Sequence, residues 1–281
     1  MAERTVLLRR SSLGDVVLLG SVTSAIEGHV TVVTAPAWIE VAERLRGVDA
    51  VVPWPTRPAG RVVDLQGSVR SLRLAPFARR IRKRSVRRRL RLWTGRGGRP
   101  TVPEIYGEAC GVRPKSAPWI EVGGTRDALA LIPGAAWKLK RAPIDILVEV
   151  GRDWSGPVVV LGGPGEEELV HGLAARIAGA DAVCERGFSR TIDTLGRTRI
   201  AVSGDTGLMH LAGACGAAVV ALFGPTHPDD GFFVYDGSVI QRELDCRPCA
   251  LHRIEHCRRG DYRCMDLSAL PVAEAVAQCA G

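Results

Sequence analysis

The chain has 281 residues, of which 46% are hydrophobic and 24% are charged, the balance of a globular protein with room for one large domain or two ordinary ones. Aromatic residues make up only 5%, which favours cores of Val, Leu, Ala and Ile and argues against an aromatic-rich sandwich. The formal charge of +8 is concentrated: residues 70–99 hold thirteen Arg and Lys and no acid, which leaves the rest at −5. The charge therefore says little about a functional site elsewhere.

Short apolar runs alternate with helical patterns in the first part of the chain. One such pattern has Pro36 near its start and Gly47 at its end, residues that are typical of the first turn and the C-terminus of a helix. The predicted strands are 5–9, 29–34, 50–54 and 61–65, and the predicted helices are 14–26, 36–47 and 102–110.

A stretch rich in Pro, Gly and polar residues at 111–126 is interpreted as a linker, after which the alternation resumes. The second set of strands is predicted at 128–132, 157–161, 199–203 and 217–223, with helices at 144–150, 166–177, 207–215 and 270–278. Strands and helices that alternate at this spacing predict parallel βαβ units, and hence two successive α/β domains, 1–120 and 121–281.

The first candidate site follows the first strand, at Ser12, Gly14 and Asp15. In open α/β sheets, ligands bind beyond the carboxyl ends of the strands, where loops lead into helices. Gly14 allows a tight turn, and Asp15 would begin the helix with its carboxylate directed at a ligand. The alternative is that Asp15 only caps the helix.

The second candidate site is the turn Asp205-Thr206-Gly207, which leads from a strand into a helix that carries His210 one turn later. Free N–H groups at a helix N-terminus, together with the helix dipole, make an anion site. On spacing alone, His210 could equally be a core histidine and the turn structural.

Two further loops follow strands of the second domain. One contains Ala135, Ala136 and Lys140 and brings cations to the same edge of the sheet, and the other ends at Glu166. Either loop could instead be an ordinary turn with no functional role.

Four of the eight cysteines cluster near the C-terminus, at Cys246, Cys249, Cys257 and Cys264. Their spacing fits a tetrahedral Cys₄ site for a structural Zn or Fe ion, with no open position for catalysis. The alternative is a set of reduced thiols in a packed tail.

Several motifs together resemble glycosyltransferase family 9, the ADP-heptose:lipopolysaccharide heptosyltransferases. They are VLLRRSSLGDVVL, DLQGSVRS, PGAAWKLKRAP, VSGDTGLMHLAGACGAAVVALFGPTHP and the tail CRPCALHRIEHCRRGDYRCMDLSALPVAEAV. The resemblance implies a GT-B fold, in which two Rossmann-like domains with parallel sheets face each other across a cleft. It also implies an inverting transfer, with the acceptor bound by residues 1–120 and the nucleotide sugar by residues 121–281.

Carried over to this chain, the resemblance makes Asp15 the general base and Lys140 the cation near the diphosphate. It assigns the donor to Ala135, Ala136, Glu166, Asp205, Thr206, Gly207 and His210, and the acceptor side to Ser12, Gly14 and Arg70. Ala135 and Ala136 stand where some relatives carry hydroxyls to the diphosphate, which leaves the donor sugar open. No Asp-x-Asp motif is present, so we expect catalysis without a divalent metal or other cofactor.

The resemblance further implies ADP-heptose as the donor and a lipid-linked glycan as the acceptor. The alternatives are another nucleotide sugar or a protein acceptor. The N-terminus lacks a clean leader because Asp15 interrupts its apolar run, so we expect a cytoplasmic protein, peripheral on the inner face of the membrane.

The Arg-rich run from Arg79 to Arg89 could touch anionic lipid there, or be a solvated helix face. It lacks interleaved aromatics, so we expect no nucleic-acid partner. A non-catalytic nucleic-acid-binding protein and a degenerate scaffold are the alternatives from other functional classes.

Overall fold

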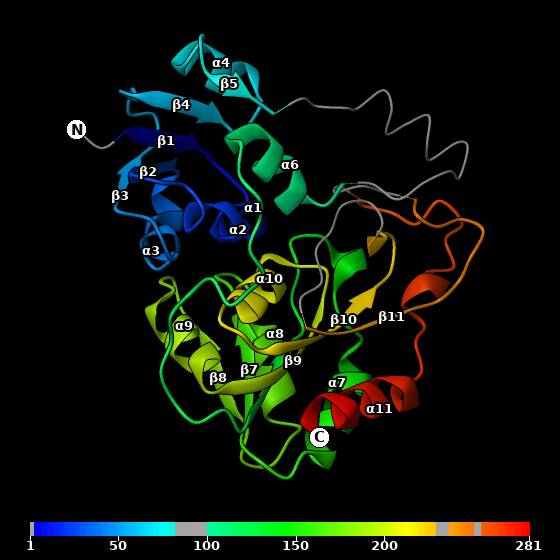
Figure 1. Cartoon of the computed structure of the whole chain (residues 1–281). Coiled ribbons are helices and arrows are strands. Elements are labelled where there is room, and N and C mark those ends of the chain that lie inside the picture. The colour runs from blue at the N-terminus through cyan, green and yellow to red at the C-terminus, as the bar shows by residue number, and fades with distance from the viewer. Residues whose placement is uncertain (1–2, 82–99, 229–235, 250–253) are drawn as a thin grey trace. The chain divides into compact units, whose positions relative to one another are not determined.

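The structure, a computed structural model, describes residues 3–81, 100–228, 236–249 and 254–281. The described residues up to Glu121 form one compact unit, and those from Val122 onward form a second. Each unit contains one fully parallel sheet (Figure 1). The predicted α/β class with parallel βαβ units is therefore confirmed. Most of the Arg-rich run, from Arg82 to Arg89, lies outside the described residues.

The first unit has five strands in the order β3-β2-β1-β4-β5. These strands are β1 (Arg4–Leu8), β2 (His29–Thr34), β3 (Ala50–Pro53), β4 (Arg61–Asp64) and β5 (Arg79–Arg80). The helices are α1 (Leu13–Val17), α2 (Gly20–Thr23), α3 (Ile39–Glu43), which follows the 3₁₀ turn η1 (Pro36–Trp38), α4 (Val69–Leu74) and α6 (Val102–Cys110). The chain winds from β1 through β2 to β3 and then returns to the other side of β1, so the winding reverses between β1 and β4.

Part of the predicted linker, residues 111–126, packs against the first unit. Trp119 and Ile120 are only 2% and 1% exposed, and Ile120 forms a β-bridge with Leu45 of the first unit. Trp119 also lies directly against the backbone of Gly20, which begins α2, so that a Cβ on Gly20 would overlap its side chain. In place of the single helix predicted at 14–26, the structure has two short helices, α1 and α2.

The second unit has six strands in the order β11-β10-β9-β6-β7-β8. These strands are β6 (Ala128–Ile132), β7 (Val158–Gly162), β8 (Asp181–Cys184), β9 (Thr198–Gly204), β10 (Ala218–Phe223) and β11 (Gly237–Gln241). The helices are α7 (Ile144–Asp153), α8 (Glu167–Ala174), α9 (Ser189–Gly196), α10 (Gly207–Ala214) and α11 (Ala269–Ala280), with 3₁₀ turns η2 (Lys138–Lys140) and η4 (Arg263–Met265). Here the winding reverses between β6 and β9, whose ends are in register at Ile132 and Ser203.

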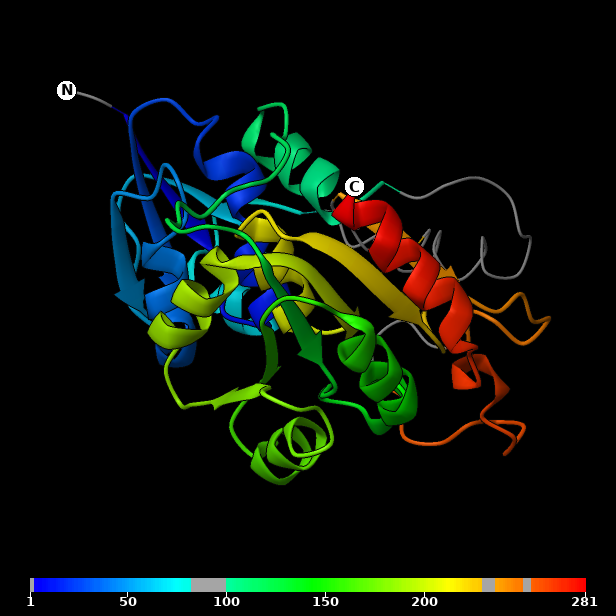
Figure 2. The same cartoon turned by 90° about the horizontal axis from the view of Figure 1, so that it is seen from below.

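The core of the second unit explains why the sequences of its strands are continuous apolar runs. Every residue of β6 and β7 is buried, as expected when both faces of a parallel sheet are covered. Alternate sheet residues such as Leu131, Val160 and Val202 form one cluster with the apolar stripes of α7, α8 and α11. Helices α7 and α11 contact each other and pack against this sheet (Figure 2). In the described part of the chain, no helix is long and apolar enough to cross a membrane.

Candidate active site

Both sheets place the predicted site residues at a point where the winding reverses. Asp15 follows β1 in the first unit, and Lys140 and Asp205 follow the neighbouring strands β6 and β9 in the second. Loops that leave adjacent strands in opposite directions open a crevice at the carboxyl edge of an α/β sheet, where ligands bind. The topology therefore brings two candidate sites to the ligand-binding edges of their sheets, one in each unit.

Asp15 lies in the first turn of α1, and its Oδ2 atom is held by three donors. Arg9 Nη2 lies 2.5 Å from this oxygen, and the backbone N and Oγ of Ser12 each donate a 3.0 Å hydrogen bond to it. Asp15 thus caps α1, as the structural alternative predicts, yet within the described residues its Oδ1 atom accepts no hydrogen bond. The side chain as a whole is 28% exposed, so it is not sealed from a ligand.

The surroundings keep Asp15 ionised. Burial alone would raise its pKa, but the Arg9 guanidinium and the hydrogen bonds from Ser12 outweigh burial and hold the pKa below its usual value. Arg9 is 12% exposed in its side chain, donates to the Leu65 carbonyl at 2.6 Å and lies 5.9 Å from the ring centre of Tyr106. The carboxylate is therefore available as a proton acceptor at neutral pH.

A second carboxylate, Asp64 at the end of β4, organises the neighbouring loop. Its Oδ1 atom accepts hydrogen bonds from the backbone N atoms of Gln66 and Gly67 at 3.0 and 2.9 Å. Gln66 Oε1 in turn accepts from the backbone N atoms of Arg10 and Ser11 at 2.9 and 3.2 Å. The loop after β4 thereby fixes the loop that carries Asp15. Asp64, Gln66 and Gly67 belong to the motif DLQGSVRS, which from the sequence served only as part of the family resemblance.

In the second unit, Lys140 and Asp205 form a buried ion pair. Lys140 Nζ donates to Asp205 Oδ2 at 2.6 Å, and the two side chains are only 7% and 6% exposed. Thr226 Oγ1 donates to the same oxygen at 2.9 Å. Sequence reasoning assigned Lys140 and Asp205 to the donor separately. The structure pairs them and adds Thr226, from the GPTHP end of the longest motif.

Backbone contact locks the two loops together at this pair. The chain at Gly204 passes so close to Lys140 that a Cβ on Gly204 would overlap the Lys140 carbonyl oxygen. The turn Thr206-Gly207 then begins α10, and among the described residues no side-chain cap is found at its N-terminus. His210 lies within α10 and is 6% exposed. An anion at this turn would meet backbone N–H groups and the positive end of the helix dipole.

The loops after β6 and β7 also meet. Glu166 accepts a 2.9 Å hydrogen bond from Gly163 N, and its carboxylate occupies the space that a side chain on Gly134 would need. Ala135, next in the loop, is buried, and Ala136 is exposed. The predicted donor residues Ala135, Glu166 and Asp205 therefore lie on loops of the same sheet edge.

The remaining site predictions are less closely grouped. On the acceptor side, Ser12 and Gly14 lie beside Asp15, whereas Arg70 is exposed on α4. Among the residues that the structure describes, no three His, Cys, Asp or Glu side chains are arranged to hold a metal ion. Burial raises the pKa of Cys249 and Cys264, and their thiol neighbours raise it further. The structural Zn or Fe site at the four cysteines stays a prediction, which elemental analysis can test.

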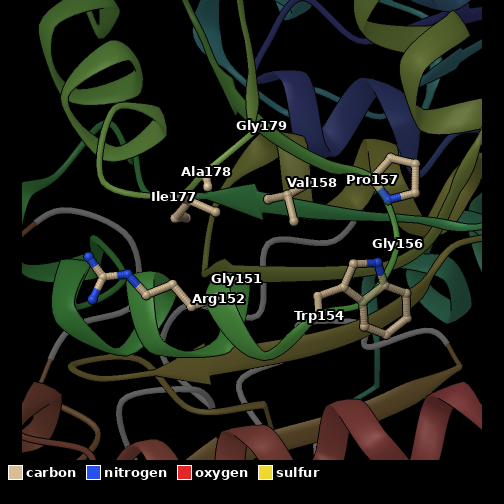
Figure 3. A pocket seen from close by; sticks show the side chains of 9 residues that line it. All are labelled: Gly151, Arg152, Trp154, Gly156, Pro157, Val158, Ile177, Ala178 and Gly179. Atoms are coloured by element: carbon tan, nitrogen blue, oxygen red, sulfur yellow. The ribbon is translucent and has the colours of Figure 1, made fainter.

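A surface hollow of about 320 Å³ elsewhere in the second unit is a poor ligand site. It is lined by Arg152 in the last turn of α7, by Trp154 directly after that helix and by Ile177 after α8 (Figure 3). Val158, which also lines it, begins β7, so the hollow lies at the amino ends of the strands. The candidate donor loops leave the opposite, carboxyl ends.

The fold and the two sites define a GT-B-like protein with two Rossmann-like units. The model of glycosyltransferase family 9 (heptosyltransferase) matches residues 112–250. This match confirms the resemblance to glycosyltransferase family 9 that the motifs predict. A search among curated proteins finds no match.

Solved structures agree with this fold. A glycosyltransferase of family 9 from Veillonella parvula has a TM-score of 0.73 at 17% identity, and the match covers 99% of this chain and 97% of that one. E. coli heptosyltransferase WaaC with ADP-2-deoxy-2-fluoro heptose has a TM-score of 0.67 at 17% identity, covering 98% and 99%. E. coli ADP-heptose lipopolysaccharide heptosyltransferase II has a TM-score of 0.69 at 15% identity, covering 98% of each chain. At these identities the structures establish the fold, and with the family match they support a glycosyltransferase.

Proposed function

We propose that this chain is an inverting glycosyltransferase that transfers heptose from ADP-heptose to a lipopolysaccharide core or related glycan, without a divalent metal. The observation that carries the proposal is the placement of Asp15 in one unit, and of the Lys140–Asp205 pair in the other, at the winding reversal of each sheet. The names of the similar heptosyltransferase structures favour ADP-heptose over other donors.

The first unit would supply the base. A sugar hydroxyl is a poor nucleophile, and a positioned carboxylate can take its proton as the new bond forms, a contribution of about 10²–10⁴ in rate. Asp15 Oδ1 would accept that proton while Arg9 and Ser12 hold Oδ2 in place. Two fixed loops, joined through Gln66, would orient the carboxylate for this step.

The second unit would hold the donor and stabilise the leaving group. The nucleoside diphosphate gains charge as the bond to the sugar breaks, and oriented donors and cations stabilise that charge. Lys140 Nζ supplies a cation beside Asp205, and the N-terminus of α10, for which no side-chain cap is found among the described residues, adds backbone N–H groups. These groups replace the metal that many glycosyltransferases use for this purpose.

The test is calorimetric titration with ADP, UDP and GDP in EDTA, followed by turnover of ADP-heptose. We expect ADP to bind selectively and Lys140→Met to weaken it by at least about tenfold, the factor expected for loss of a charged hydrogen bond. The matched control is Lys138→Met, because Lys138 is exposed two residues away. Preference for UDP or GDP would overturn the donor but keep the enzyme class. Failure to bind any of the three would contradict the proposal, and activity that strictly needs Mg²⁺ or Mn²⁺ would contradict its metal-free part.

A further inference from the structure

The first unit exposes apolar side chains in one short segment. The described residues contain five large apolar side chains that are exposed, and three of them fall within nine residues: Val69 is 65% exposed, Leu72 44% and Phe77 99%. The other two, Tyr262 and Leu270, are in the second unit. Single exposed apolar residues need no explanation, but such a concentration indicates a contact surface.

The exposure follows from how α4 is fixed. Ser71 is buried and donates from Oγ to Asp64 Oδ2 at 2.8 Å, so this side of α4 faces the sheet. Val69 and Leu72 are three residues apart, and Arg73 is four residues from Val69, so the three share the opposite, outward face. The exposed face of the helix is therefore both apolar and basic.

Phe77 lies in a turn that is held at both ends. Arg80 Nε donates to Asp64 Oδ2 at 2.6 Å, and Arg80 Nη2 donates to the Ala75 carbonyl at 2.8 Å. The same buried carboxylate thus anchors α4 through Ser71 and the following turn through Arg80. Phe77 is presented on an ordered turn, a costly placement for an aromatic ring in water.

The charges around these side chains indicate what kind of partner would bind here. Arg70 and Arg73 are exposed and make no ion pair within the described part of the chain. The sequence from residue 70 to residue 99 contains no acid that could neutralise them. A surface with a projecting aromatic ring, aliphatic neighbours and unneutralised guanidinium groups matches the interface of an anionic bilayer, which offers phosphates above an apolar layer.

We infer that Val69, Arg70, Leu72, Arg73 and Phe77, called here the α4 patch, form a docking surface for anionic lipid membranes. Phe77 and Leu72 enter the boundary between headgroups and acyl chains, and the arginines bind lipid phosphates with their stems along the apolar layer. The docking needs neither the donor nor the acceptor, so it goes beyond the proposed transfer reaction.

The test is sedimentation of the full-length chain with vesicles of phosphatidylcholine, alone or mixed with phosphatidylglycerol, so that no glycan is present. We expect binding to the mixed vesicles, and about tenfold weaker binding for Phe77→Ser. Phe77→Trp should bind at least as well as the unchanged chain, because Trp favours membrane interfaces. Arg73→Ser should cost roughly fivefold.

Matched controls separate the patch from general effects. Leu270→Ser removes a side chain that is 65% exposed in the second unit, and Arg186→Ser removes an exposed arginine there; neither should change vesicle binding. Affinity for ADP should be the same in Phe77→Ser as in the unchanged chain, so the outcome is independent of the proposed donor site. Equal binding of Phe77→Ser and the unchanged chain, or equal binding to neutral and anionic vesicles, would overturn the inference and favour a protein partner for this surface.

Discussion

Asp15 combines a structural role with a chemical one. Its Oδ2 atom caps α1 and pairs with Arg9, whereas its Oδ1 atom accepts no hydrogen bond within the described residues. If the carboxylate is the base, Asp15→Asn should lower kcat by about 10²–10⁴ and leave ADP binding unchanged, because the donor residues lie in the other unit. Single-turnover kinetics and calorimetry measure the two effects separately. Loss of ADP binding with kcat otherwise intact would instead make Asp15 a donor contact.

The same residue predicts a dependence of stability on pH. The pKa of Asp15 is lowered by folding from an ordinary value of 3.8, so its ionised form stabilises the fold above that pH, and this contribution is lost as the pH falls through the lower, folded-state pKa. Asp15→Asn should therefore reduce the free energy of unfolding by about 2 kcal/mol at neutral pH. Urea unfolding at a series of pH values should find this difference shrinking below pH 3.8. A difference that is constant down to the acid limit would contradict the assignment.

At the scale of elements, the close contact between the loops after β6 and β9 has a testable cost. Gly204→Ala would push a methyl group into the Lys140 carbonyl, which is backbone and cannot swing aside. We expect a loss of roughly 1–3 kcal/mol of stability and weaker ADP binding, because Lys140 must move away from Asp205. Gly163→Ala is the matched control: it changes a glycine just after β7, where a Cβ would meet its nearest neighbour at an ordinary 3.8 Å. Thermal unfolding and calorimetry of both variants check the prediction, and equal behaviour would contradict it.

Local signals determined which elements could be predicted. The helix Val102–Cys110 is found at its predicted bounds, because Thr101 and Glu104 form a capping box and Gly111 ends it. The strands β2 and β6 also match, since each is a clean apolar run. These elements are specified by residues adjacent in the sequence.

Elements that depend on distant residues were missed or misjudged. Helix α4 was not predicted, because Val69 and Leu72 face outward and its apolar pattern points away from the core. At the site, the motifs located Lys140 and Asp205, but their ion pair spans 65 residues and follows only from the adjacency of β6 and β9. The role of Gln66 likewise depends on the pairing of β1 with β4, which no local pattern contains.

On the scale of the whole molecule, the candidate functions are divided between the units. The base and the α4 patch are in the first unit, and the buried pair proposed to bind the donor is in the second. The basic window also belongs to the first part of the sequence, so the net charge of +8 does not describe the donor site. Binding of lipid and binding of nucleotide should therefore respond differently to solution conditions.

Salt makes this difference measurable. Exposed charges more than about 8 Å apart are largely screened at physiological ionic strength, whereas a pair that is 7% and 6% exposed is screened much less. Raising the salt concentration should thus release the chain from anionic vesicles and change its ADP affinity only slightly. Replacing Arg82, Lys83 and Arg84 by Ser lowers the formal charge from +8 to +5 and should flatten the salt dependence of vesicle binding without changing ADP affinity. Parallel salt titrations of sedimentation and calorimetry test this, and a common salt response of lipid and nucleotide binding would show that the two sites are not separate.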